Sequence, residues 1–261
     1  MAPSAPEPEP VAAALECVSV EHDVSVRVAA EVGSRAWGYA GPASDHDVGV
    51  VYAQRPPEYV VLDGYTPSIH DEYAGVDVRA WNLTRFAELL VESNPTALEF
   101  LASPTVYRTC PGAEAVREHA LASFSPIDVY HHYRSLATSQ HEADAPVSRR
   151  LHVVRAALYA RYVLDTHEFP DPVFPDFLDA EGARFPDAWV AAARTLCDRK
   201  RAGEGGATLG DTDEDDIADV PDGLLDLPRE VDPDVHAVRG VEREQVNEFV
   251  RAAFEDAYST V

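Results

Sequence analysis

Two strand patterns joined by a short polar segment constrain this chain more than any other feature. Residues 24–32 alternate between apolar and polar side chains, which predicts a half-buried strand. The run DVGVVY at 47–52 is short, apolar and β-branched, and predicts a second strand. A Gly-Ser pair follows the first strand, and an Asp-x-Asp triplet opens the second after ten intervening residues. This half of the chain is therefore expected to be α/β.

Each part of this polar segment has a chemical use. Gly33 lets the backbone approach a bulky anion, and Ser34 adds a hydroxyl and a backbone N–H beside it. A helix starting there would also favour a phosphate at its N-terminus. Asp45 and Asp47 are two residues apart, so on a strand both side chains are expected on one face. Two carboxylates facing a phosphate cradle predict a Mg²⁺ site.

A third carboxylate is expected from a predicted hairpin further along the chain. The runs 69–73 and 76–81 flank Ala74-Gly75, which is typical of a hairpin turn. Asp77 lies on the second strand between two valines whose side chains face the other way. Asp77 is thus the candidate third ligand. The alternative is that Asp77 lies on the solvent-exposed face of an edge strand and binds no metal.

The combined pattern resembles the DNA polymerase β-like nucleotidyltransferase superfamily. Within it, the finer pattern is most similar to the predicted nucleotidyltransferases associated with RNA ligases. The likeness is strong over residues 24–108, weaker to about 178, and absent beyond. Five segments carry it: Gly33-Ser-Arg-Ala-Trp-Gly-Tyr, Ser44-Asp-x-Asp-x-Gly, Asp77-Val78-x-x-Trp81-x-Leu83, Asn94-Pro95-Thr96-x-x-Glu99-Phe100-Leu101-x-Ser103-Pro104-x-x-Tyr107, and Leu151 to Val163, with Arg155, which resembles the family's later helix.

The resemblance implies an α/β (α+β) fold: a polymerase β-like nucleotidyltransferase domain with a small mixed sheet, followed by a mostly helical domain. It implies transfer of NMP from an NTP, with ATP expected, to a hydroxyl acceptor on RNA, protein or a small molecule, with pyrophosphate leaving. Asp45, Asp47 and Asp77 are then the catalytic residues and the ligands of two Mg²⁺ ions. Asp77 would bind the second ion or take the hydroxyl proton as general base.

The resemblance also implies which residues bind the nucleotide. Gly33 and Ser34 would cradle the β- and γ-phosphates, and the planar guanidinium of Arg35 would contact the same phosphates. Arg155, on a later predicted helix, would reach the nucleotide from the other side of a cleft; the alternative is a solvated helix arginine. Trp37 would stack on a base or fill the core.

The sequence departs from the family at two positions and leaves other functions open. Asn82 stands where the family has Asp, and Phe100 where it has Trp, so the third carboxylate depends on Asp77 alone. The association with RNA ligases favours RNA repair or modification by analogy. The alternatives are an antitoxin-type protein adenylyltransferase and a catalytically silent nucleotide-binding regulator.

The rest of the chain predicts mostly helices. Apolar residues at helical spacing fall in 147–167, 187–201 and 241–258. We expect a disordered leader at 1–18, because its start is rich in Pro and Glu and lacks a secretory pattern. The nucleotidyltransferase domain is expected at 19–110 and the helical domain at 111–261, with an exposed acidic loop at 203–219.

The charge balance points to a salt-rich cytoplasm. The chain has 46 Asp+Glu against 21 Lys+Arg, a net charge of −25, and Lys200 is its single lysine. Molar salt would screen such self-repulsion, so we expect a cytoplasmic protein of haloarchaeal type; the alternative is a protein that binds polycations. Three widely spaced cysteines argue against a disulfide framework or Cys-rich zinc site. No apolar run approaches the length of a membrane span.

Overall fold

The computed structural model describes residues 7–142, 144–208 and 220–258. The chain divides into two compact units. The first comprises Met1–Ala36, Asp45–Phe124 and Gly240–Val261; the second comprises Trp37–Ser44 and Ser125–Arg239. No helix within the described ranges is long and apolar enough to cross a membrane.

A five-stranded mixed sheet forms the centre of the first unit, in the order β3-β4-β2-β1-β5. β1 runs antiparallel to β2 and β5, β2 runs parallel to β4, and β3 runs antiparallel to β4. The predicted strands and hairpin are therefore confirmed, and the fold is the expected α/β class. The strands are β1 (Ser25–Val32), β2 (His46–Ala53), β3 (Ser68–Tyr73), β4 (Val76–Asn82) and β5 (Val106–Arg108).

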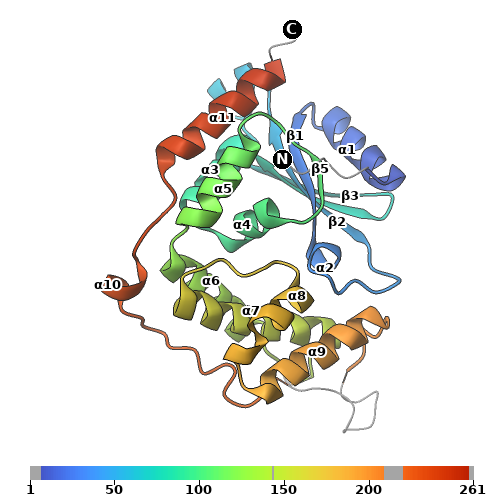
Figure 1. Ribbon diagram of the computed structural model, residues 1–261. Helices are drawn as coiled ribbons and strands as arrows, with labels where there is room; N and C mark the ends of the chain where they lie inside the picture. The colour runs from blue at the N-terminus through green and yellow to red at the C-terminus, as the bar shows by residue number, and fades with distance from the viewer. Residues whose placement is uncertain (1–6, 143, 209–219, 259–261) are drawn as a thin grey trace. The chain divides into compact units, whose positions relative to one another are not determined.

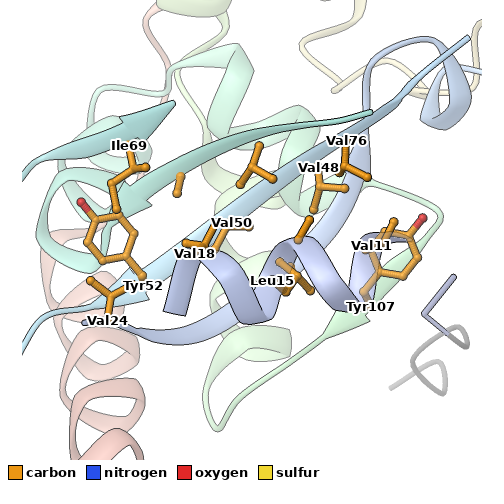
Figure 2. Close-up of a cluster of buried hydrophobic side chains, with 14 residues drawn as sticks. Val11, Leu15, Val18, Val24, Val48, Val50, Tyr52, Ile69, Val76 and Tyr107 are labelled. Atoms are coloured by element: carbon orange, nitrogen blue, oxygen red, sulfur yellow. The ribbon is translucent and has the colours of Figure 1, made fainter. Parts of the chain in front are cut away.

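Helix α1 (Glu9–Glu21) covers one face of this sheet (Figure 1). Val11, Leu15 and Val18 recur at helical spacing and are fully buried. They pack against alternate residues of the central strands, among them Val48 and Val76 (Figure 2). Because alternate side chains of a strand point to opposite faces, the residues between these valines must face away from α1.

The opposite face is covered by α3 (Leu83–Val91) and α4 (Pro95–Ala102), with α5 (Ala113–Ser123) and α11 (Arg243–Tyr258) packed outside them (Figure 1). Asn82 and Asn94 cap α3 and α4 through their side-chain oxygens. The Phe100 ring packs directly over Gly49 of β2, where a Cβ would lie 2.6 Å from the ring. α4 therefore needs glycine at that position of the sheet.

The second unit is helical. Its elements are α6 (Pro126–Ser139), α7 (Val147–Thr166), α8 (Phe174–Glu181), the 3-10 turn η2 (Gly182–Arg184), α9 (Asp187–Arg201) and the short α10 (Pro233–His236). α7 is buried on nearly all sides rather than along a single apolar stripe, because α6 and α9 both pack on it. The segment Trp37–Ser44 belongs to this unit: Phe174 N–H donates to Trp37 O (3.0 Å) and Arg201 Nη2 to Gly38 O (2.6 Å).

The structure differs from the predicted domain boundaries in three places. The leader prediction is wrong from Glu9 onward, because α1 buries its apolar side chains against the sheet. Residues 113–123 and 243–258 belong to the sheet unit, since α5 and α11 pack against each other and against α3 and α4. Residues 37–44 belong to the helical unit. The predicted acidic loop lies outside the described residues at 209–219.

Two short helical turns complete the first unit. α2 (Gly33–Ala36) follows β1 directly, and the 3-10 helix η1 (Pro56–Val60) follows β2. A helix start was considered beside the Gly-Ser pair; α2 begins with that pair and is only one turn long.

Candidate active site

Asp47 and Asp77 are direct neighbours on adjacent parallel strands. Their Cα atoms are paired in the register of β2 and β4. The flanking residues Val48, Val76 and Val78 belong to the α1 core, so both carboxylates point to the opposite face of the sheet. The two carboxylates expected from distant motifs are thus brought together.

Gly33 lies against the carboxylate of Asp47. A Cβ at Gly33 would stand 2.1 Å from Asp47 Oδ2, and the residue has a φ of +66°. Both observations require glycine, one for space and one for the left-handed backbone. Gly33 faces Asp47 because Val32, the residue before it, is paired with Asp47 in the β1–β2 register.

Asp45 and Arg35 complete this end of the sheet. Asp45 is exposed and immediately precedes β2, so it is not on the strand as predicted. Arg35 Nε donates to the backbone carbonyl of Asp45 (3.1 Å), which connects the α2 turn to the Asp-x-Asp triplet. Ser34 is half-buried within α2, next to Gly33.

Negative charge is crowded around Asp47. Burial, followed by the neighbouring Asp77 carboxylate, raises the pKa of Asp47 above its ordinary value, and Glu31 and Asp45 add to the effect against the opposing Arg79. Such a site favours a bound cation or proton.

Asp77 already has two basic neighbours. His70 Nε2 lies 2.8 Å from Asp77 Oδ1, and Arg79 Nη2 donates to Asp77 Oδ2 (3.3 Å). Both partners are mostly solvent-exposed, with 68% and 63% of their side chains accessible. The sequence analysis did not predict either residue. A two-residue turn at Ala74-Gly75 does, however, set the hairpin register that places His70 diagonally from Asp77.

The donor set suits Mg²⁺, because carboxylate oxygens are the ligands that this ion prefers. As the side chains stand, however, no three His, Cys, Asp or Glu residues in the described ranges are arranged to hold a metal ion. Asp77 is turned toward its basic neighbours instead. Coordination by three carboxylates would require His70 and Arg79 to give up Asp77, which their exposure permits.

A second polar cluster supports the same strand ends from the other face. Glu31 is buried, with 3% of its surface exposed, and is in register with Val48. Its Oε2 accepts hydrogen bonds from Tyr107 Oη and lies 2.9 Å from His46 Nδ1, while Ser103 Oγ donates to the Glu31 carbonyl (2.6 Å). These contacts hold the end of β1 in place, together with His46, which lies between Asp45 and Asp47.

The segment Asn94–Tyr107 supplies two of these contacts. The sequence marked it as a family motif but did not predict its structural role. Ser103 and Tyr107 lie in the Asn94–Tyr107 motif, whose signal was family likeness alone. In the structure that motif is α4, its cap and β5, and it supports the strands rather than supplying a residue to the acidic face.

Arg155 lies in the helical unit, on α7, and only 2% of its surface is exposed. The alternative of a solvated helix arginine is therefore wrong. Its guanidinium carbon stands 3.8 Å from the centre of the Trp37 ring, which also makes an edge contact with His152. Trp37 thus packs inside the helical unit, and Arg155 helps to hold the 37–44 segment there.

Comparison with known proteins finds three similarities. A family model described as the RNA repair pathway DNA polymerase beta family (RlaP) matches residues 8–252. An uncharacterized protein, YcgL of Bacillus subtilis (strain 168), is 28% identical over 200 residues, covering 73% of this chain and 75% of that protein. A crystal structure of a nucleotidyltransferase-like protein from Exiguobacterium sibiricum 255-15 aligns with 94% of this chain and 77% of that one, at 11% identity and a TM-score of 0.30.

Proposed function

Because this chain belongs to the RNA repair pathway DNA polymerase beta family, it is a polymerase β-like nucleotidyltransferase, and we propose the reaction that it performs. The enzyme transfers NMP from an NTP, with ATP as the expected donor, to a hydroxyl acceptor and releases pyrophosphate. The family description favours an RNA end as the acceptor. We further propose that the protein works in a cytoplasm of high salt concentration.

One observation carries this proposal: Asp47 and Asp77 are paired across adjacent strands, and Gly33 lies against Asp47. A carboxylate pair beside a glycine turn places cation ligands next to backbone that an anion can approach closely. The pKa of Asp47 is raised by burial first and by the neighbouring Asp77 carboxylate second, and an adjacent divalent cation would offset both effects.

Asp45, Asp47 and Asp77 are the residues that would hold Mg²⁺. When bound, two such ions would neutralise the triphosphate and lower the pKa of the acceptor hydroxyl. Asp77 has a further role available, since a carboxylate oxygen released by His70 or Arg79 can take the hydroxyl proton. His70 and Arg79 would then keep Asp77 in position until substrate arrives.

Gly33, Ser34 and Arg35 are assigned to the triphosphate. Gly33 has no side chain to obstruct the β- and γ-phosphates, and Ser34 follows it with a hydroxyl and a backbone N–H. Arg35 is exposed and held by its Nε at Asp45, so its guanidinium stays beside the acidic residues. Contact between Arg155 and the nucleotide remains a prediction, while its burial supports a structural role.

Pyrophosphate release tests the reaction. Each NTP is incubated with Mg²⁺ and RNA bearing a free 3′-hydroxyl in molar KCl, using wild type and the Asp77→Asn variant. We expect release with wild type and a loss of at least about 10²-fold in the variant. The matched control is Asp71→Asn on β3, which removes a carboxylate that contacts His22 and lies in register with Val78, so it should leave the rate unchanged.

The same assay separates the alternatives. Release that requires a protein acceptor rather than RNA would favour the adenylyltransferase alternative. Nucleotide binding without release, whichever acceptor is offered, would contradict the transferase proposal and favour a silent regulator.

A further inference from the structure

The helical unit contains a pocket of about 390 Å³ that the reaction above does not use. Its walls come from α6, α7, the residues that lead into α9, and the segment around Leu227. Aromatic and charged side chains gather in its lining: Tyr130, Arg161, Asp165, Arg184, Phe185 and Trp189. The volume falls in the range of small-molecule sites.

The aromatic rings of the pocket are held in place by hydrogen bonds and packing. Tyr130 Oη donates to Pro228 O (2.7 Å), and Trp189 Nε1 donates to Asp222 O (3.2 Å). Phe185 is buried and packs on Phe177 of α8. Fixed aromatic rings offer flat apolar surface to a planar ligand without a large loss of side-chain entropy on binding.

Arg161 supplies a positive charge that no carboxylate neutralises in the described part of the chain. Its Nη2 donates to Gly223 O (2.7 Å), and its guanidinium stacks on Trp189, 4.6 Å from the ring centre. Within those residues its Nη1 makes no hydrogen bond and no carboxylate lies at ion-pair distance. The Arg161 guanidinium is therefore held by backbone carbonyls and an aromatic ring, and its charge is available to an anionic group of a ligand.

A second cation lies beside the same pocket. Arg184 lines it, is exposed, and pairs with Glu181 one turn earlier. Against these two arginines the lining contains one carboxylate, Asp165. The lining therefore combines planar apolar walls with two arginines, one of them paired with Glu181, in a molecule whose net charge is −25.

We propose that this pocket binds a nucleotide, with the base against the aromatic side chains and the phosphate toward Arg161 and Arg184. Stacking is tolerant of sequence because every base has a flat face, and it survives high salt better than phosphate contacts do. Binding itself is independent of the proposed reaction. Use of the pocket to hold a nucleotide of an acceptor strand rests on the proposed function.

The test is calorimetric titration in molar KCl with EDTA, using 5′-AMP and a single-stranded oligoadenylate of about five nucleotides. Trp189→Ala should weaken binding of both probes roughly tenfold. Arg184→Gln should weaken it and Asp165→Asn should strengthen it, and both positions are exposed enough to leave folding intact. The control is Arg194→Gln on α9, which makes the same charge change away from the pocket and should have no effect.

Two comparisons decide the outcome. Equal affinity for both probes would support a free nucleotide as the ligand, whereas much tighter binding of the oligonucleotide would support a nucleotide within a single strand. Binding should be unchanged in an Asp45→Ala/Asp47→Ala variant, so failure of the proposed reaction would not affect this result. The proposal would be overturned if neither probe binds, or if the affinities of the Trp189, Arg184 and Asp165 variants equal that of wild type.

Discussion

Gly33 and Asp47 restrict each other at the scale of single residues. The carboxylate occupies the space where a side chain at Gly33 would begin, and the backbone there is left-handed. The sequence predicted both residues as members of one site, because glycine and paired acids have recognisable chemical uses. It could not predict their contact, which depends on the register between β1 and β2.

Gly33→Ala should therefore disrupt the site more than it disrupts the fold. The added Cβ would displace Asp47, so we expect metal-dependent NTP affinity to fall by at least about tenfold, with a stability loss of about 1–2 kcal/mol from the left-handed backbone. Gly75→Ala is the matched control: its φ is +82° but no atom lies within 4 Å of the new Cβ. Equal loss of affinity in both variants, measured by calorimetry, would contradict the account.

Asp47→Asn should stabilise the metal-free protein while abolishing metal-dependent binding. The pKa of Asp47 is raised from 3.8, so the protonated form is favoured in the folded state. Stability from this group is complete below its unfolded pKa and is lost as the pH rises through the raised value. Asparagine cannot ionise, so the variant should gain stability over wild type as pH increases.

Thermal melts from about pH 3 to about pH 7 measure this difference. The gain in Tm should be absent at the acidic end and reach about 2–4 °C for each kcal/mol relieved at neutral pH. Asp71→Asn, which removes a carboxylate paired with His22, should show no such gain. A variant that loses stability relative to wild type as pH rises would show that Asp47 is stabilised as an anion.

At the scale of elements, α4 and β5 support the acidic edge of the sheet. α4 presses Phe100 onto Gly49, and its C-terminal side leads to Ser103, which donates to the Glu31 carbonyl. These elements are short, at 8 and 3 residues, and prolines punctuate them. The sequence marked this segment only by its likeness to the family, and the long-range contacts show its structural role.

Helix α1 illustrates a different limit of sequence reasoning. Its spacing of Val11, Leu15 and Val18 was readable as one apolar face, but the preceding Pro- and Glu-rich residues suggested disorder. The longer periodic segments were predicted well: α7 and α9 begin at the expected residues, Val147 and Asp187. Apolar residues at helical spacing locate a helix when they extend over many turns, and less well when the helix is short and follows a Pro- and Glu-rich segment.

Gly49→Ala should destabilise the fold by forcing α4 away from β2. A Cβ would meet the Phe100 ring at 2.6 Å, and overpacking of this kind costs about 1–3 kcal/mol in the free energy of unfolding. Denaturant titration should show that Phe100→Leu in the same background restores part of the loss, although Phe100→Leu alone destabilises. Strictly additive effects of the two substitutions would rule out this contact as the cause.

At the scale of the whole molecule, a net charge of −25 on 261 residues predicts that folding depends on salt. Charge and composition were readable from the sequence. The assignment of segments to the two units was not, because Trp37–Ser44 is contiguous with the sheet in sequence but belongs to the helical unit. Its placement there depends on contacts with Arg155, Phe174 and Arg201.

The Tm should rise steeply as KCl increases from about 0.1 M to several molar, because the Debye length shortens from about 10 Å to about 3 Å at 1 M. Sucrose at the same osmolality is the control, since it is excluded from the protein surface but does not screen charge. A Tm that is insensitive to KCl, or that sucrose raises equally, would contradict adaptation to high salt.

The central claim, that Asp45 and Asp47 hold the metal that binds the triphosphate, is tested most directly by calorimetry. Each NTP is titrated into wild type and an Asp45→Ala/Asp47→Ala variant in molar KCl, with Mg²⁺ and with EDTA. The account predicts Mg²⁺-dependent binding of at least one NTP to wild type and its loss in the variant. Binding of equal strength in both proteins, or no binding of any NTP to wild type, would contradict it.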